Sequence, residues 1–361
     1  MDAAELEALL ERHAAFWARS SVDRPLLNVS TFTPESAYEL RGLDLPMADG
    51  TVLSTQDSAL TPEMVDPHVI VDVQEYPRRV EAGTSGGPQR VDDLLLTRAP
   101  LVKMVWVEAV LGCQVIPKLD TGSIYSVPFL DGPEQVSRIL PPENSPWLEL
   151  LEETTRHLVE DSRGEYQVVQ CAQRGPIDLA SAVLGHSEMC FAILDKPAEL
   201  RALTEVCTEA FITVVKAQEA LIPPLNGGYC TGYGVWAPGT VVRTQCDVTS
   251  SLSAKMYEEH FLPFDVEICK GFDYSVIHLH SGYLHTVDVL LKEKYPTAIQ
   301  VVLDTGSTPY TVHDLIPVFA RILEEKPLIL QGSMTPRELD EALEKLPPRG
   351  LYVSTDITEA P

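Results

Sequence analysis

The last third of the chain alternates apolar segments with amphipathic ones, and this regularity limits the fold more than any other feature of the sequence. It predicts strands centred near residues 277, 301, 329 and 352, with helices over 283–293, 311–324 and 336–345. Each strand–helix unit takes roughly 25 residues, which is typical of parallel strands joined by right-handed helical crossovers. The pattern therefore predicts an α/β fold with a parallel sheet.

The same alternation extends towards the amino terminus, although less regularly. It predicts strands over 26–32, 123–130, 166–172 and 241–248, and helices over 3–19, 146–160, 178–192, 195–221 and from Ser253 through a kink at Pro263. A closed (β/α)8 TIM-type barrel fits better than an open sheet, because no Gly-x-Gly-x-x-Gly or P-loop motif follows an early strand. We expect one barrel domain over 1–361, with 1–25 as an N-terminal helical extension. Loops 33–60 and 83–95 stay unassigned.

Acidic residues outnumber basic ones by almost two to one. The chain of 361 residues has 53 Asp and Glu against 27 Lys and Arg, which gives a net charge of −26. A surface this negative repels phosphate backbones and anionic lipid headgroups. Nucleic acid and membranes are therefore not expected as partners, and a small-molecule substrate is.

The cysteines indicate a reducing environment. Seven of them are scattered along the chain, and none belongs to a Cys-x-x-Cys pair, which is typical of free thiols. The first residues are acidic and amphipathic, without the basic start and apolar block of a signal peptide. No uninterrupted apolar run approaches the ~20 residues that span a bilayer. The sequence thus predicts a cytoplasmic protein.

Two histidines end the strand predicted over residues 273–282. Side chains alternate between the faces of a strand, so His278 and His280 lie on one face and Ile277 and Leu279 on the other. The carboxyl end of a parallel strand is where α/β folds carry their chemistry. The pair predicts a metal site or an acid/base pair, with two hydrogen-bonded core histidines as the structural alternative.

A metal would need more than these two imidazoles. Zinc takes at least three protein ligands, so Asp304, Asp356 or Cys246 would have to supply the third. Asp304 opens a tight strand exit, where it would either orient a histidine or cap the following turn.

Other polar residues also follow the ends of predicted strands. If the barrel closes, these residues meet at one rim, and the aromatic loop from Asn226 to Pro238 is expected to overhang them. The predicted catalytic residues are His278, His280, Asp304 and Asp247. The predicted metal ligands are His278, His280 and Asp356. The predicted substrate-binding residues are Tyr229, Tyr233, Trp236, Arg174, Arg243, Gln245 and Gln331.

Four segments, in this order, resemble the uroporphyrinogen decarboxylase superfamily. They are Trp106–Cys113, Pro176–Gly185, Asp247–Pro263 and His278–Gly282. The resemblance implies a (β/α)8 barrel that acts either as the haem-pathway decarboxylase or as a cobamide-dependent methyltransferase. The methyltransferases of this superfamily move a methyl group to a thiol or another acceptor.

Departures from the family pattern argue against the decarboxylase substrate and change the metal ligands that a zinc methyltransferase would use. The decarboxylases carry an arginine-bearing stretch near the amino terminus that grips substrate carboxylates, whereas the segment from Arg24 to Arg41 has only these two arginines. A tetrapyrrole with eight carboxylates would also be repelled by the net charge. The zinc methyltransferases use a His-x-Cys pair and a late cysteine. Here the pair is His278 and His280, and the late segment offers Asp356, a harder ligand than a thiolate.

The resemblance therefore implies methyl transfer between a methylated corrinoid protein and a small acceptor, assisted by zinc. A separate corrinoid protein is expected as a partner, because no segment resembles a cobalamin-binding domain. One alternative is a metal-free decarboxylase of a carboxylate, tetrapyrrole-like substrate, with His280 as the acid and Arg174 or Arg243 aimed into the mouth. A second alternative is a non-catalytic binding or accessory protein on the same fold. A homodimer is compatible with the sequence, which does not specify the oligomeric state.

Overall fold

The computed structural model describes residues 2–31, 45–53, 59–68, 93–100, 104–118, 123–304 and 310–358. Its helices are α1 (Ala3–Trp17), α4 (Trp106–Val110), α5 (Pro146–Ser162), α6 (Pro176–Leu184), α7 (His186–Asp195), α8 (Pro197–Leu221), α9 (Ala254–His260), α10 (Leu262–Lys270), α11 (Val287–Lys292), α12 (Val312–Glu325) and α13 (Pro336–Lys345). Short 3-10 turns include η5 (Asp247–Ser251).

Six strands form a parallel sheet in the order β1-β14-β13-β12-β11-β10. They are β1 (Leu26–Thr31), β10 (Val241–Gln245), β11 (Tyr274–His280), β12 (Ala298–Val302), β13 (Leu328–Gln331) and β14 (Leu351–Ile357). A second parallel pair consists of β4 (Thr97–Arg98) and β7 (Gln167–Val168). Antiparallel pairs lie outside these parallel strands. They are β2 (Leu45–Pro46) with β3 (Val52–Leu53), β5 (Gln114–Lys118) with β6 (Ser123–Val127), and β8 (Tyr229–Cys230) with β9 (Trp236–Ala237).

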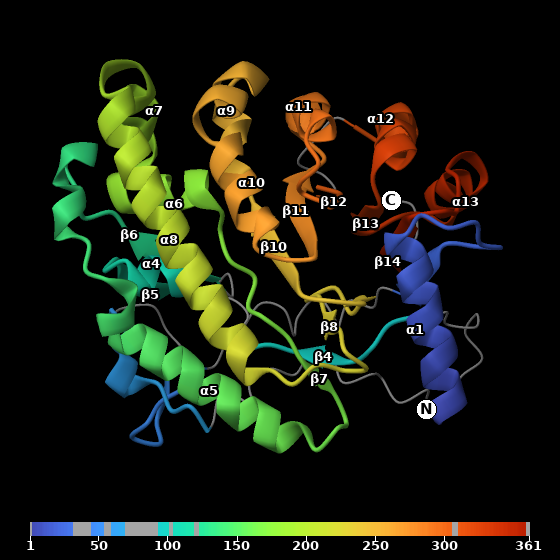
Figure 1. Ribbon diagram of the computed structural model, residues 1–361, viewed down its shortest axis with the longest axis horizontal. Helices are drawn as coiled ribbons and strands as arrows, with labels where there is room; N and C mark the ends of the chain where they lie inside the picture. Colours follow the sequence, from blue (N-terminus) through green and yellow to red (C-terminus); the bar gives the residue numbers. More distant parts are fainter. Residues whose placement is uncertain are drawn as a thin grey trace.

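The six-stranded sheet and the β4–β7 pair together supply the eight strands of a (β/α)8 barrel. Single hydrogen bonds connect the two parts: Asp93 N–H donates to Leu27 O at 2.9 Å, and Gly175 N–H donates to Gln245 O at 3.1 Å. The helices form an arc outside the strands, from α5 and α8 through α10 to α13 (Figure 1). The predicted TIM-type barrel with an N-terminal helical extension is confirmed, and β11 to β14 lie at the predicted positions.

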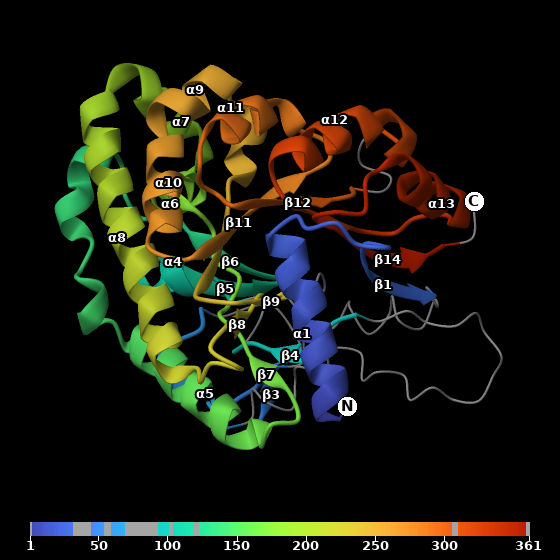
Figure 2. The same ribbon diagram turned by 45° about the vertical axis from the view of Figure 1, so that its right-hand side comes forward.

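The inward face of the strands is apolar where the strands begin. A buried cluster joins α1, the β8–β9 hairpin and the first inward residues of the strands; it contains Phe16, Trp17, Leu26, Val235, Ala237, Val241, Val276, Ala298, Ile329 and Tyr352. Trp17 Nε1–H donates to Trp236 O at 2.9 Å, which ties the helix to the hairpin. In Figure 2, α1 lies in front of this end of the barrel, beside β4 and β7. We call this cluster the barrel floor.

The hairpin position differs from the expectation that residues 226–238 overhang the mouth. This segment follows α8 and precedes β10, so it lies where strands begin, at the opposite end from the His278 rim. One predicted helix and one predicted strand also need correction. The helix expected over 178–192 is two helices, broken at Gly185, whose φ of +90° is costly for any residue with a Cβ. The strand expected over 166–172 is only β7.

Within the described chain, no single helix has the length and apolar composition needed to cross a membrane. The helices α6 and α7 have this length and composition only when they are counted together, and the chain bends by 108° between them.

A buried histidine connects α1 to the hairpin of the floor. His13 is fully buried; its Nε2–H donates to Asp93 O at 2.7 Å, and its Nδ1 accepts the N–H of Trp236 at 2.9 Å. Burial is the largest cause of a His13 pKa lowered to about 4, because a protonated ring would lose the Trp236 bond and its solvation.

This lowered pKa predicts an acid-sensitive floor. The unfolded chain takes up the His13 proton near pH 6.5 and the folded chain only near pH 4, so this stabilisation is complete above pH 6.5 and lost as the pH falls to 4. The loss is about 3 kcal/mol of unfolding free energy. Urea unfolding between pH 7 and pH 4 should show a smaller pH slope for His13→Gln than for wild type. Equal slopes would contradict the assignment.

Candidate metal centre

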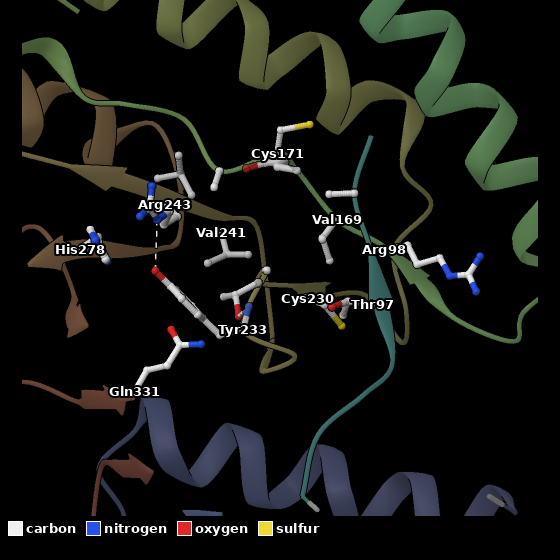
Figure 3. A pocket seen from close by; sticks show the side chains of 16 residues that line it. Thr97, Arg98, Val169, Cys171, Cys230, Tyr233, Val241, Arg243, His278 and Gln331 are labelled. Carbon is white, nitrogen blue, oxygen red and sulfur yellow. Dashed lines mark hydrogen bonds between the residues drawn. The ribbon is translucent and has the colours of Figure 1, made fainter. Parts of the chain in front are cut away.

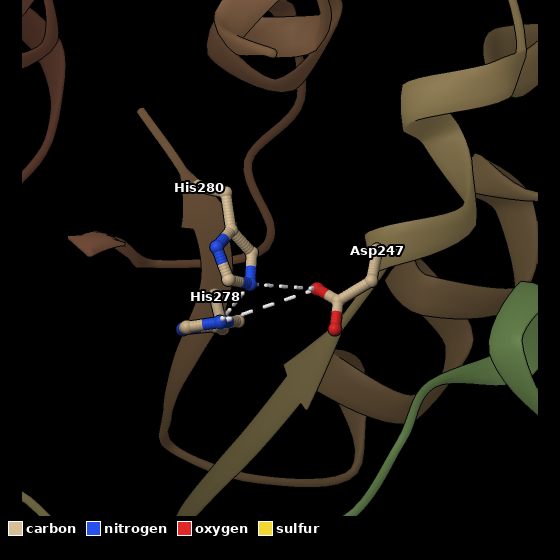
Figure 4. A group of neighbouring side chains, drawn as sticks. All are labelled: Asp247, His278 and His280. Carbon is tan, nitrogen blue, oxygen red and sulfur yellow. Dashed lines mark hydrogen bonds and ion pairs between the residues drawn. The ribbon is translucent and has the colours of Figure 1, made fainter. Parts of the chain in front are cut away.

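Two adjacent strands bring three ligand-type side chains together. In the β10–β11 register Gln245 is paired with His278, so His278, His280 and the residue just after β10, Asp247, come to one place at the barrel rim. One ligand atom from each of these residues lies within 4.8 Å of the others. The two Nε2 atoms are 3.2 Å apart, and Asp247 Oδ1 is 3.7 Å from His280 Nε2 and 4.0 Å from His278 Nε2 (Figure 4).

The other nitrogen of each ring has an acceptor. His278 Nδ1 is hydrogen-bonded to Gln300 Oε1, and His280 Nδ1 is 2.7 Å from Asp304 Oδ1. Since both partners are oxygen acceptors, each Nδ1 carries the proton of a neutral ring, and each Nε2 carries a lone pair. Burial is the main cause of a His278 pKa lowered to about 3, and the Arg243 guanidinium lowers it further. Near neutral pH His278 is therefore an unprotonated ligand.

With no proton on either Nε2, the two lone pairs repel at 3.2 Å unless a cation lies between them; with a proton on one, the contact is the hydrogen bond of the structural alternative. Around them the charge is negative, with Asp247 and Asp304 in contact with His280 and Asp178 behind Asp247. A zinc ion with bonds of 2.0–2.1 Å in tetrahedral geometry holds its nitrogen ligands about 3.3–3.4 Å apart, close to the observed separation. Outer acceptors on both rings are also typical of metal-bound histidines. The residues present therefore fit a divalent metal held by two imidazoles and one carboxylate.

The third ligand differs from the one expected. The structure brings Asp247 to the imidazoles, whereas the carboxylate of Asp356 accepts a hydrogen bond from Ser30 on the neighbouring β1 and is exposed. Cys246 is fully buried, and burial raises its thiol pKa. Neither Asp356 nor Cys246 belongs to the cluster that the described residues form.

Asp247 is positioned by a second, buried carboxyl group. Asp178 of α6 accepts the backbone N–H groups of Asp247 at 3.2 Å and of Val248 at 2.9 Å, at the first turn of η5. Burial, and then the charge of Asp247, raises the pKa of Asp178 to about 7. Tyr283 O–H donates to Asp247 Oδ1 at 3.4 Å, and its ring lies 5.3 Å from that of His280. The turn that carries Asp247 is thus held from two sides.

Asp178→Asn should weaken metal binding by roughly 10-fold, because outer partners of ligands contribute about 10–100-fold to affinity. The matched control is Asp265→Asn. Asp265 is equally buried, and burial raises its pKa to about 7, but its carboxylate accepts from Thr244 and Tyr257 and does not touch Asp247. Competition with a coloured zinc chelator measures both variants. Equal affinities for Asp178→Asn and wild type would remove the positioning role.

The predicted substrate-binding residues divide into two groups. Arg243, Gln245, Tyr233 and Gln331 surround the inner side of His278: Arg243 Nη1–H donates to Gln245 Oε1 at 2.5 Å, and its Nε–H donates to Tyr233 Oη at 3.1 Å. Gln245 Nε2–H in turn donates to Asp247 Oδ2 at 2.8 Å. This chain of bonds connects Arg243 to the metal ligands.

The remaining three lie elsewhere. Arg174 Nη1 is 3.2 Å from the buried Glu108 Oε1, so its charge is already balanced. Trp236 lies on β9 of the hairpin, where it packs into the main hydrophobic core and its Nε1–H donates to Leu225 O at 2.8 Å. Tyr229 packs beside Leu158 and Ile222, next to α5 and α8. The two aromatic residues had been assigned to the mouth because the loop was placed at the wrong end of the strands.

Three residues of the site were missed from the sequence: Gln300, Asp178 and Tyr283. Gln300 is fully buried on β12 in register with His278, and besides that imidazole it accepts the O–H of Tyr233 at 3.0 Å. A glutamine inside the apolar run Ala298–Val302 was a usable signal, because a buried polar side chain needs a partner. Asp178 and Tyr283 act through a turn whose path the sequence does not show.

Residues 100–220 match the family model described as uroporphyrinogen decarboxylase (URO-D). This segment is similar to the uroporphyrinogen decarboxylase family. This confirms the resemblance inferred from the sequence motifs, two of which, Trp106–Cys113 and Pro176–Gly185, lie inside the matched segment.

A solved structure shares the fold of this chain. A methyltransferase from Methanosarcina mazei superposes with a TM-score of 0.63 at 14% identity, covering 97% of this chain and 93% of that one. A B12-independent methionine synthase from Shewanella sp. W3-18-1 has a TM-score of 0.38 at 12% identity, covering 57% of this chain and 59% of its own, too low to add to the argument. No curated protein matches the sequence.

Proposed function

We propose that this uroporphyrinogen decarboxylase-like barrel is a metal-assisted methyltransferase that passes a methyl group between a methylated corrinoid protein and a small acceptor. The observation that carries the proposal is the pair of Nε2 lone pairs, 3.2 Å apart and joined by Asp247, at the rim of the barrel. A methyltransferase among the structures with this fold supports the same reading. We also propose that the chain forms one barrel domain with a helical extension. Its seven free cysteines support a location in the cytoplasm.

The residues of the chain have distinct roles in this proposal. His278, His280 and Asp247 would hold zinc, which when bound lowers the pKa of a coordinated thiol or water. Asp304 and Gln300 keep the ring protons on Nδ1 and so keep both Nε2 atoms available as ligands. Arg243 presents a positive charge on the inner side of the site, where it attracts the anionic part of a substrate.

Metal content and methyl transfer test the proposal together. Purified protein should contain about one zinc per chain, measured by atomic emission, because three protein ligands converge on one place. Mixed with methylcobalamin and a panel of small thiols, it should release the demethylated cobalamin, seen by its visible spectrum, and lose this activity after chelation. Protein that holds no zinc after zinc addition, or that transfers methyl groups equally well after chelation, would overturn the proposal.

A metal-free decarboxylase is the second candidate, favoured by Arg243. Among the described residues no carboxylate pairs with this guanidinium, so a substrate carboxylate could do so. In that reaction His280, held by Asp304, would protonate the carbon that loses carbon dioxide. Release of carbon dioxide from a carboxylic acid substrate, unchanged by chelators, would favour it.

A further inference from the structure

The barrel encloses a cavity of about 210 Å³ on the inner side of His278, bounded by β4, β7, β10 and the β8–β9 hairpin. Figure 3 shows that its lining is divided. His278, Arg243 and Gln331 lie at one end, and Cys230, Val169 and Thr97 lie towards the other. A cavity with a charged end and an apolar end suits an amphipathic molecule.

Arg243 is held in place without a counter-ion. Its Nε–H donates to Tyr233 Oη at 3.1 Å, and its Nη1–H groups donate to Gln173 O at 3.1 Å and Gln245 Oε1 at 2.5 Å. No described residue accepts a hydrogen bond from Nη2, and no described carboxylate lies within ion-pair distance. A guanidinium at a cavity wall with a free, oriented donor is arranged to bind a carboxylate.

The charge of the whole chain makes this unpaired cation significant. With a net charge of −26 the protein has acidic side chains in excess, yet within the part of the chain that the structure describes none hydrogen-bonds to Arg243. The nearby Arg174, by contrast, is balanced by Glu108. A half-buried cation without a partner costs stability, and a bound anion removes that cost.

Apart from Arg98, the side chains at the other end of the cavity are uncharged. This end is lined by Ala99, Val169, Cys171, Cys230 and Val241. Burial raises the pKa of the Cys171 and Cys230 thiols to about 12, so both are neutral at physiological pH. The guanidinium of Arg98, which also lines the cavity, stacks over the Tyr166 ring at 4.5 Å. This end therefore suits an alkyl or aryl group.

We propose that the acceptor bound here is a small monocarboxylic acid with an apolar body. Its carboxylate lies on Arg243, and its apolar body extends towards Cys171 and Cys230. The volume matches a molecule of about seven to ten non-hydrogen atoms, since a water takes up about 30 Å³. That the bound acid accepts a methyl group rests on the proposed methyltransferase function, whereas its binding requires no metal.

Calorimetric titration of the full chain, stripped of metal, tests the proposal. The probes are butyrate, hexanoate, benzoate and phenylacetate, with hexanamide and benzamide as uncharged partners. The carboxylates should bind at least about tenfold more tightly than the amides, and Arg243→Gln should remove this difference, because a charge-assisted bidentate contact is lost. Arg201→Gln, which removes the same charge from an exposed position on α8, is the control and should bind like wild type.

A second variant tests the apolar end and guards against misfolding of the first. Ala99→Leu narrows the cavity, so affinity should shift from hexanoate towards butyrate by at least about tenfold in their ratio while the carboxylate is still required. Carboxylates that bind no better than amides, or a chain-length preference unchanged in Ala99→Leu, would overturn the proposal. Zinc content is measured on the same preparations. Protein that binds carboxylates but holds no zinc would support this site and overturn the methyltransferase function. Protein that holds zinc but binds no carboxylate would overturn this site and leave the methyltransferase function supported.

Discussion

Replacing His278 or His280 by alanine is expected to remove the bound metal. Each variant leaves one imidazole and one carboxylate, and zinc requires at least three protein ligands. Loss of an outer partner alone costs roughly 10–100-fold, so loss of a ligand should lower zinc affinity by more than about 100-fold. Zinc per chain after gel filtration should fall from about one to below about 0.1, and methyl transfer should fall with it.

The control for this experiment is His186→Ala, at an exposed position on α7. It should retain the zinc content of wild type. This result would show that removing an arbitrary histidine does not cause the loss of zinc seen in the other two variants. Circular dichroism should show wild-type helix content for all three variants, since both imidazoles lie at the rim and not in the floor. Full zinc content in His280→Ala would mean that the lone-pair argument is wrong.

The second large effect is expected for Gln300→Leu. Leucine has nearly the same size but no acceptor, so the Nδ1–H of His278 and the O–H of Tyr233 both lose their partner. Each buried donor left without an acceptor costs about 1–3 kcal/mol of folding free energy. The His278 proton is then free to move to Nε2, which blocks that nitrogen as a ligand. Zinc affinity should fall by about 10–100-fold.

Gln300→Glu is the matched variant, because a carboxylate keeps the acceptor for both donors and strengthens the hold on the Nδ1 proton. It should bind zinc within about tenfold of wild type, although it places a charge on a fully buried position. Chelator competition gives the affinities, and the histidine nitrogen resonances in NMR spectra report the tautomer of His278 directly. An unchanged tautomer in Gln300→Leu would contradict the role given to Gln300.

The sequence predicted much of the barrel because the relevant signal is local. The strands β11 to β14 are short, mostly buried runs rich in apolar residues, and the helices between them carry caps such as the Thr335–Glu338 capping box. Strands β4 and β7 are only two residues long each. Segments this short have no hydrophobic period to detect in the sequence. Their place in the barrel depends on contacts with other parts of the chain.

The histidine pair could be predicted from the spacing of His278 and His280 on one strand. The third ligand could not, because it depends on which strand lies beside β11. Asp356 ends β14, three strands away in the sheet, whereas Asp247 follows the adjacent β10. Tyr229 and Trp236 were misplaced for another reason. Their loop lies between a predicted helix and a predicted strand, and this order places it at the end where the strands begin.

The interrupted wall of the barrel has a consequence for dynamics. Where β4 and β7 meet their neighbours, single hydrogen bonds such as that from Gly175 to Gln245 replace a continuous ladder. Amides of this pair should therefore exchange with deuterium faster than those of β11 and β12, which are paired along their length on both sides. Since the same two strands border the cavity, a molecule bound there should slow their exchange more than that of the six-stranded sheet, giving an occupancy signal independent of turnover.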